Sequence, residues 1–339
     1  MNKVDNGNGL EMAYLDEGHG NDVILLLHGF PELAYSWRHV IPALAQAGYR
    51  VIAPDQRGYG ETTGWPSGYD VNLEPYSFKN LVDDVLGLLN ALNIPSVAAV
   101  VGHDFGSPVA AWAAMTRPDV FQRLGLMSAP FGIPTTNVFK AVASLLPPRV
   151  HYHRYYASPT ADSDMRRAPQ GLHDFLRGYF HYKSGDHPAN QTHPLTQEEL
   201  GLLPTYYVME AGKTMPETVF DEMPAKTSNW LTDDELATYC HEYARTGFQG
   251  GLNWYRARLA GIDTAKRGPI RVPTIFIAGE HDWGVYQSPG SFESMQRTIC
   301  SDFRRAYFVD AAGHWVQQEQ PKEVVELLLR FLEQIKASK

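Results

Sequence analysis

The chain has 339 residues, of which 44% are hydrophobic and 20% are charged, and its formal net charge is −9. These values are typical of a globular protein, and the length predicts one large domain or a core with an insertion. Because the sequence contains no block of basic residues, it argues against a nucleic-acid surface and against a polybasic membrane anchor.

Short apolar runs recur along the chain, each about the length of one strand. In chain order they are DVILLLHGF (22–30), YRVIAPD (49–55), SVAAVVGHD (96–104), RLGLMSAP (123–130) and VPTIFIAGEHD (272–282). Several do not alternate with polar residues, which is typical of strands buried on both faces. Helical patterns lie between them, such as 78–93, where Leu81, Val85, Leu88, Leu89 and Leu92 share one face. Strands alternating with helices predict a mostly parallel α/β sheet.

This alternation lapses between about residues 131 and 262, where helical patches such as GLHDFLRGYF are separated by proline-rich and polar stretches. We therefore predict an α/β core in two parts, 1–132 and 263–339, with a mainly helical cap at 133–262. The cap is expected over the carboxyl edge of the sheet, where open α/β sheets place their sites.

The stretch VVGHDFGSPVAAWAA places Asp104 between an apolar run and an alanine-rich helical pattern. It matches the G-x-S-x-G nucleophile turn, with Asp in place of Ser. Gly102 and Gly106 would relieve crowding around the strained central residue. A second reading stays open from these residues alone, namely a strand that ends in Gly followed by Asp as the N-cap of a helix.

Two further strand ends carry the residues that would complete a triad. Asp282 follows the run VPTIFIAG, and His314 follows RRAYFVD in the segment AAGHW. The chain order of nucleophile, acid and His is the order of an α/β-hydrolase. Glu280 is an alternative acid, although Asp282 fits the loop position better.

The segment HGFPE (28–32) is a candidate for the oxyanion hole, which needs two backbone N–H groups that converge on one point. Phe30 can offer one N–H, and Phe105, directly after Asp104, can offer the other. Pro31 cannot donate and would stiffen the loop. An ordinary Gly-Pro turn would also account for this segment by itself.

Taken together, the segments HGFPE, DQRGYG, GHDFG, GEHDWG, GHW and LNWYR resemble the epoxide hydrolases of the α/β-hydrolase superfamily. The matching segments run from about Leu25 to Gln320. The resemblance implies an α/β-hydrolase fold with an inserted helical cap. It also implies that Asp104 is the nucleophile, His314 the general base and Asp282 the charge-relay acid.

The same resemblance implies two cap tyrosines that donate protons to the epoxide oxygen. The N-W-Y-R segment gives Tyr255. The other tyrosine precedes an aromatic pair by two residues, which in HYHRYYASP selects Tyr152, with Tyr155 or Tyr156 as the fallback. The sequence departs from the family pattern at Phe105, where a Trp is usual, and at Thr62, where a Ser is usual.

The chemistry of an epoxide explains a carboxylate at the elbow. A Ser that attacked the saturated carbon would form an ether, which water does not readily cleave. Asp104 would form an ester, and a water activated by His314 could attack its carbonyl and release a vicinal diol. The protein would then be a hydrolase acting on ether bonds, with no metal or organic cofactor. His151 and His153 resemble a metal pair, but no carboxylate or Cys completes a convincing site.

Two rival functions remain. A haloalkane or haloacid dehalogenase shares the Asp-His-acid machinery but needs side-chain donors beside the nucleophile, which Phe105 lacks. A non-catalytic ligand-binding relative would have no physical need for the triad and both tyrosines. For either enzyme we expect the substrate pocket to include four residues near the motifs, namely Pro31, Trp37, Trp283 and Trp315.

Cys240 and Cys300 are the only cysteines, and the first 18 residues contain no apolar signal segment. Two cysteines cannot form a disulfide framework, so a reducing cytoplasm is expected. The expected partner is a small-molecule epoxide, with no nucleic acid and no membrane. The sequence leaves open whether the chain is a monomer or a homodimer.

Overall fold

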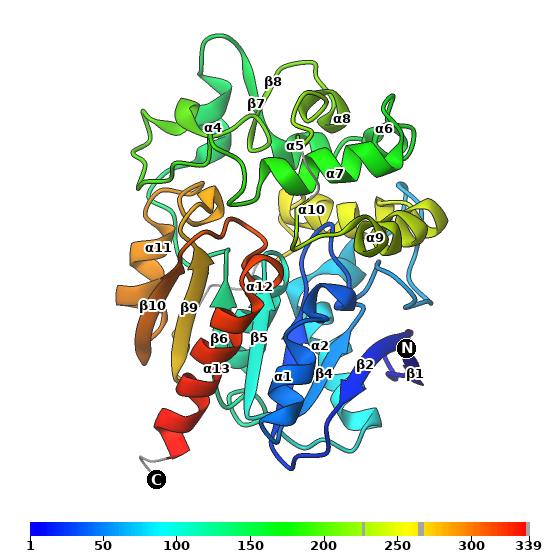
Figure 1. The fold of residues 1–339 in the computed structure, drawn as a ribbon, viewed down its shortest axis with the longest axis vertical. Helices are drawn as coiled ribbons and strands as arrows, with labels where there is room; N and C mark the ends of the chain where they lie inside the picture. The colour runs from blue at the N-terminus through cyan, green and yellow to red at the C-terminus, as the bar shows by residue number, and fades with distance from the viewer. Residues whose placement is uncertain (226–227, 264–267, 337–339) are drawn as a thin grey trace.

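The computed structural model describes residues 1–225, 228–263 and 268–336, and its centre is an eight-stranded sheet (Figure 1). The strand order is β1-β2-β4-β3-β5-β6-β9-β10. β1 and β2 pair antiparallel, β2 is antiparallel to β4, and the remaining pairs are parallel. The strands are β1 (Asn2–Asp5), β2 (Glu11–Glu17), β3 (Val23–Leu27), β4 (Arg50–Pro54), β5 (Ala99–His103), β6 (Leu124–Met127), β9 (Thr274–Gly279) and β10 (Phe303–Val309).

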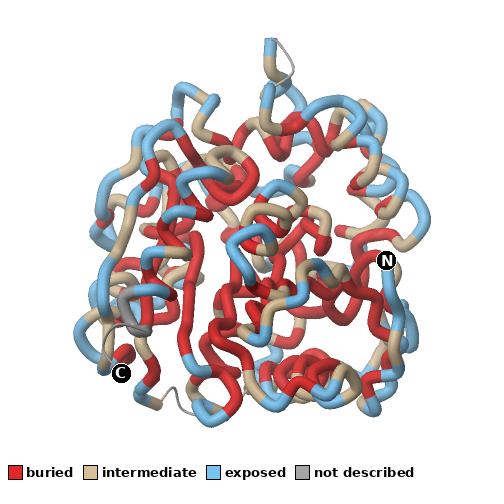
Figure 2. Tube along the Cα trace, turned by 60° about the horizontal axis from the view of Figure 1, so that its bottom comes forward, coloured by how far each residue is buried: buried red, intermediate tan, exposed pale blue. Residues whose placement is uncertain are grey.

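Helices cover both faces of the sheet and bury the apolar runs between them. α1 (Ile41–Gln46) and α13 (Pro321–Lys336) pack on one face, and α2 (Phe78–Ala91) and α3 (Gly106–Thr116) pack on the other. Every residue of β3, β5, β6 and β9 is buried, as the non-alternating runs predict. Figure 2 shows this buried interior, with exposed residues on the outside. The mostly parallel α/β sheet is confirmed.

The chain between β6 and β9 forms a mainly helical layer above the carboxyl ends of the parallel strands (Figure 1). Two of its longer helices, α7 and α9, pack against each other. The boundaries of this cap at residues 133 and 262 stay a prediction. Its helices and strands are α4 (Val138–Ala143), β7 (Arg149–His151), α5 (Tyr152–Tyr156), α6 (Ala161–Arg166), α7 (Leu172–Tyr182), β8 (Val208–Glu210), α8 (Met215–Thr218), α9 (Asp233–Thr246) and α10 (Gln249–Leu259).

Short helical turns connect the larger elements. They are η1 (Ala34–Trp37), η2 (Glu74–Tyr76), η3 (Leu200–Leu202), η4 (Trp283–Val285), α11 (Ser291–Ser294), η5 (Met295–Ile299) and α12 (Val316–Glu319). None of the helices in the described parts of the chain combines the length and the apolar character needed to cross a bilayer.

Hydrogen bonds fix the helical layer to the core. The Trp254 indole on α10 donates to the Arg57 carbonyl at 2.9 Å, and the Arg38 guanidinium donates to the Glu235 carboxylate on α9 at 2.8 Å. The backbone N–H of His314 donates to the Lys183 carbonyl, also at 2.9 Å. The cap is therefore held directly over the loops that follow the parallel strands.

Candidate active site

Asp104 occupies a strained turn between β5 and α3. Its φ is +48°, in the left-handed region that non-glycine residues rarely adopt. A Cβ at Gly102 would lie 2.1 Å from the Gly106 carbonyl oxygen, and one at Gly106 would lie 2.2 Å from the Leu27 carbonyl oxygen. Both positions therefore require glycine, because neighbouring backbone atoms leave no room for a Cβ. The helix-cap reading is wrong, because the residue that caps α3 is Phe105 and the Asp104 side chain points elsewhere.

The loop after β3 brings a backbone donor to the Asp104 carboxylate. The Phe30 N–H donates to Asp104 Oδ1 at 2.9 Å. Gly29 makes this approach possible, since a Cβ there would lie 2.4 Å from the Asp104 Cβ. The predicted donor Phe30 thus faces the oxygen that would become the carbonyl oxygen of an ester. The matching role of the Phe105 N–H stays a prediction.

The loops after β9 and β10 bring Asp282 and His314 to the same place. His314 Nε2 lies 3.2 Å from Asp104 Oδ2, and His314 Nδ1 lies 3.0 Å from Asp282 Oδ1. Asp282 Oδ1 also accepts the Gly284 N–H at 2.7 Å, which fixes the carboxylate. Glu280, the alternative acid, is exposed to solvent. The three predicted triad residues are therefore within hydrogen-bonding distance of each other in the expected order.

Both triad carboxylates are ionised at neutral pH. Burial alone would raise the pKa of Asp104, but the hydrogen bond and charge of His314 outweigh it and hold that pKa well below its usual value. For Asp282, burial again opposes, and the charge and hydrogen bond of His314 lower the pKa. The lowered pKa of Asp104 therefore favours its anionic form over the whole physiological range.

A cavity of about 200 Å³, here called the inner cavity, opens above Asp104. Its lining includes the side chains of Tyr152 from α5 and Tyr255 from α10, whose ring centroids are 6.0 Å apart. Burial raises the pKa of both phenols well above 10, so both carry their protons at any working pH. Two protonated phenols from the cap thus line the same cavity as one carboxylate from the core.

The fallback tyrosines make other hydrogen bonds, although the Tyr156 ring packs against the Tyr152 and Tyr255 rings at centroid distances of 5.4 and 4.9 Å. The Tyr156 hydroxyl donates to the Tyr179 hydroxyl at 3.0 Å, and the Tyr155 hydroxyl approaches the Asp164 carboxylate at 3.4 Å. Neither residue belongs to the lining of the inner cavity in the described parts of the chain. Of the three candidates in HYHRYYASP, the structure brings Tyr152 to Asp104.

A buried ion pair beneath the elbow was not predicted. His103 Nδ1 lies 2.6 Å from Glu32 Oε2, and His103 Nε2 lies 2.6 Å from the His314 carbonyl oxygen. A carboxylate and a carbonyl can only accept, so both nitrogens of His103 carry hydrogen. Burial opposes both charges, but their mutual attraction lowers the pKa of Glu32 and raises the pKa of His103. This pair joins the Phe30 loop, the elbow and the His314 loop from below.

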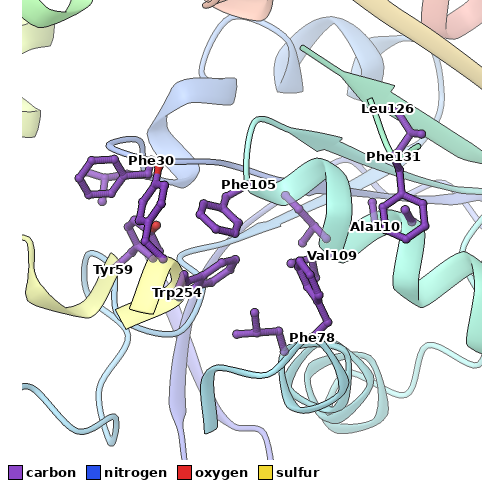
Figure 3. Packing of buried hydrophobic residues seen from close by; sticks show 14 of the residues in the cluster. Phe30, Tyr59, Phe78, Phe105, Val109, Ala110, Leu126, Phe131 and Trp254 are labelled. Atoms are coloured by element: carbon purple, nitrogen blue, oxygen red, sulfur yellow. The ribbon is translucent and has the colours of Figure 1, made fainter. Parts of the chain in front are cut away.

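The two residues that depart from the family pattern, Phe105 and Thr62, are both buried. The Phe105 ring packs edge-on against Trp254 and Tyr255, with centroid distances of 5.3 and 4.7 Å. Figure 3 shows it between Trp254 on one side and Val109 on the other. Thr62 Oγ1 accepts the Ala13 N–H and donates to the Asp55 carbonyl, which are bonds that a Ser hydroxyl could also make.

The pocket residues expected from the sequence are placed differently. Among the described residues, the lining of the inner cavity does not include Pro31, Trp37, Trp283 or Trp315. Trp37 ends η1, which turns its side chain into the core cluster beneath α1 and α13. The Trp315 indole donates to the Phe180 carbonyl at 2.8 Å and its ring packs against His314. Instead of Trp283, its neighbours Gly284 and Val285 line the cavity.

Metal ligands are a separate question, raised by His151 and His153. Within the described ranges, no group of three or more His, Cys, Asp or Glu side chains is arranged to hold a metal ion. His151 is buried against Phe139 at a centroid distance of 4.8 Å. His153 lines the inner cavity, a position that sequence patterns did not reveal.

Known proteins resemble this chain over most of its length. Residues 22–321 match the family model described as "alpha/beta hydrolase fold". Epoxide hydrolase A of Mycobacterium tuberculosis is 35% identical over 344 residues, covering 96% of this chain and 95% of that protein. An epoxide hydrolase from an endophytic Streptomyces superimposes with a TM-score of 0.82 at 31% identity, covering 99% and 96%. Epoxide hydrolase I of potato (Solanum tuberosum) gives a TM-score of 0.75 at 30% identity, covering 96% and 97%.

Proposed function

Because the chain belongs to the α/β-hydrolase fold family and, within it, to the epoxide hydrolases, we propose that it converts epoxides to vicinal diols through an ester on Asp104. One observation carries this proposal. The Asp104 carboxylate has one oxygen on the Phe30 N–H and the other beside His314, and it faces two protonated phenols across the inner cavity.

In the first step Asp104 Oδ2 attacks a ring carbon of the epoxide. A carbon–oxygen bond to Asp104 forms as the ring bond to oxygen breaks, and the electron pair of that bond stays on the departing oxygen. Tyr152 and Tyr255 hydrogen-bond to this oxygen and supply its proton, so that an alkoxide need not leave unassisted. Their raised pKa values keep the donors in the protonated form.

In the second step a water molecule attacks the carbonyl carbon of the ester. His314 accepts a proton from this water while Asp282 holds its Nδ1 side. Negative charge develops on Asp104 Oδ1, where the Phe30 N–H is already 2.9 Å away, and the Phe105 N–H is proposed as the second donor. Collapse of this intermediate breaks the carbon–oxygen bond to the diol, and the leaving oxygen takes the proton from His314. The carboxylic acid left on Asp104 gives up the second proton of the water, which restores the phenol that donated its proton in the first step and regenerates the carboxylate.

The test is a single turnover in ¹⁸O-labelled water, followed by mass spectrometry of the peptide that contains Asp104. Water attacks the carbonyl carbon in the proposed mechanism, so the label should enter the Asp104 carboxylate and be absent from the first diol. Direct attack of water on the epoxide would instead label the first diol and leave Asp104 unlabelled, and that result would refute the ester.

Two less specific proposals accompany this function. Cys240 and Cys300 are both free, which supports a reducing cytoplasmic location. The oligomeric state stays open between a monomer and a homodimer, and sedimentation of the purified protein would decide it.

A further inference from the structure

A second cavity of about 430 Å³, here called the outer cavity, adjoins the inner one. Both are lined by Phe105 and Pro108 from the elbow, by Pro130 and Pro134, and by His153 and Gln287. A molecule with its reactive group at Asp104 can therefore extend past His153 into the outer cavity. The two volumes together suit a substrate considerably larger than the epoxide ring.

The walls of the outer cavity are aromatic. Phe78 stacks on Trp112 at 5.8 Å with an interplanar angle of 22°, and Phe131 meets Trp112 edge-on at 6.1 Å. Val138 and Phe139 from α4 complete this apolar surface. The Arg258 guanidinium lies 3.6 Å from the centroid of the Phe78 ring, so the surface offers an aryl or other apolar group burial among aromatic side chains.

The basic side chains of the outer cavity do not favour an anionic group. Arg258 is there, but its guanidinium is 2.7 Å from the Asp263 carboxylate, so its charge is already balanced. His151 is also in the lining, and burial lowers its pKa well below the usual value, which leaves it neutral. The observations therefore favour a neutral group.

The junction between the cavities also carries polar side chains. His153, Gln287 and Ser288 line both cavities. The His153 ring lies 4.4 Å from the Tyr152 ring and 4.9 Å from the Tyr255 ring, so it is close to the site of the epoxide oxygen. Burial lowers the pKa of His153 to about 3, and the imidazole therefore offers one N–H and one lone pair.

We infer that the preferred substrates are neutral epoxides whose ring is joined through an ether or hydroxyl-bearing link to an aryl or similarly bulky apolar group. The oxygen of the link hydrogen-bonds with His153, and the apolar group fills the outer cavity. His153 is thus a specificity-determining residue. This inference depends on the proposed function, because it describes the substrate of the same site.

The test compares phenyl glycidyl ether with (2-phenylethyl)oxirane, in which a methylene replaces the ether oxygen. The quantity compared is the kcat/KM for the ether divided by the kcat/KM for its carbon analogue. If His153 makes one neutral hydrogen bond to the ether oxygen, this ratio should be about three- to tenfold higher in the wild type than in His153→Leu. Comparing the two enzymes cancels the intrinsic reactivities of the compounds and any loss of folded protein. His153→Gln, which restores a donor, should recover most of the preference.

His173→Leu is the matched control, since His173 is an exposed residue of α7 and should leave the ratio unchanged. A His153→Leu ratio equal to that of the wild type would overturn the role of His153. Failure of the proposed function looks different, because the wild type would then form no diol from either compound or from styrene oxide.

The outer cavity is tested separately with Val138→Phe, which places extra volume in its wall. This variant should lower kcat/KM for phenyl glycidyl ether severalfold more than for methyl glycidyl ether, which has no aryl group to place there. Equal losses for the two ethers would overturn the assignment of the aryl group to the outer cavity.

Discussion

Gly29→Ala tests the approach of the Phe30 loop to the nucleophile. An alanine Cβ at this position would lie 2.4 Å from the Asp104 Cβ and 2.5 Å from Oδ1, whereas ordinary contacts begin at 3.4 Å. The two segments must therefore separate by about 1 Å. The nearest atom is the Asp104 Cβ, whose position is fixed by the backbone, so a side-chain rotation would not relieve the contact. The Phe30 N–H···Oδ1 distance of 2.9 Å would then approach 4 Å, which is beyond a hydrogen bond.

The expected loss follows from this displacement. Removing one oxyanion donor costs about 10²- to 10³-fold in kcat, and a 1 Å misplacement of a reacting group costs about 10²-fold. We therefore expect kcat to fall by about 10²-fold or more in Gly29→Ala. Ester hydrolysis should slow more than ester formation, because the oxyanion develops during hydrolysis.

The assay is rapid acid quenching during turnover, with the ester on Asp104 measured by mass spectrometry and the diol by chromatography. Gly201→Ala is the control, since Gly201 is exposed and a Cβ there would meet only the Leu145 side chain at 3.4 Å. A Gly29→Ala enzyme whose Tm matches the wild type and whose kcat lies within threefold of it would refute the reasoning.

Three other perturbations have defined outcomes. His314→Gln should still open the epoxide but not hydrolyse the ester, so intact-protein mass spectrometry should find the enzyme heavier by one substrate. Tyr152→Phe and Tyr255→Phe should each slow single-turnover ring opening by about 10- to 10²-fold, and the double variant by more, whereas unchanged rates would remove the assigned donors. Glu235 has a pKa lowered to about 2, because its bonds to Arg38 and the Thr232 N–H outweigh the opposing effect of burial. Glu235→Gln should therefore cost about 1–3 kcal/mol of unfolding free energy at pH 7, and in thermal melts this difference should shrink between pH 4.5 and 2. A difference independent of pH would contradict the ionised state of Glu235.

The parts of the site at strand ends could be predicted from the sequence. Fully buried parallel strands leave continuous apolar runs, and the carboxyl ends of such strands meet at one edge of the sheet. Asp104 and Asp282 follow such runs, and His314 follows β10, a partly exposed edge strand whose carboxyl end lies at the same edge of the sheet, so their convergence is a consequence of topology. The need for glycine at positions 102 and 106 could also be predicted, because an elbow with φ of +48° at Asp104 leaves no room for a Cβ on either side.

Residues that depend on how loops turn could not be predicted in this way. Trp37 is close to the HGFPE motif in sequence, yet η1 directs it into the core on the far side of the sheet. Tyr152 and Tyr156 are four residues apart on the same helix face, and local periodicity does not separate them. Long-range hydrogen bonds separate the two tyrosines. The Tyr152 N–H donates to the Tyr207 carbonyl, whereas the Tyr156 hydroxyl donates to Tyr179.

The Glu32–His103 pair was not predicted, although the sequence contained the observations needed to predict it. Glu32 follows a buried strand in an apolar loop, and His103 is the last residue of β5, so both side chains could be expected to be buried. A buried charge is stable only when it is paired, and two such residues beside one turn are each other's natural partner. The side-chain amides of Gln317 and Gln318 both donate to Glu32 Oε1 at 2.8 Å and complete its bonding. Because this network joins all three loops, the 2.9 Å contact of the Phe30 N–H with Asp104 is set by buried charges beneath the elbow before any substrate arrives.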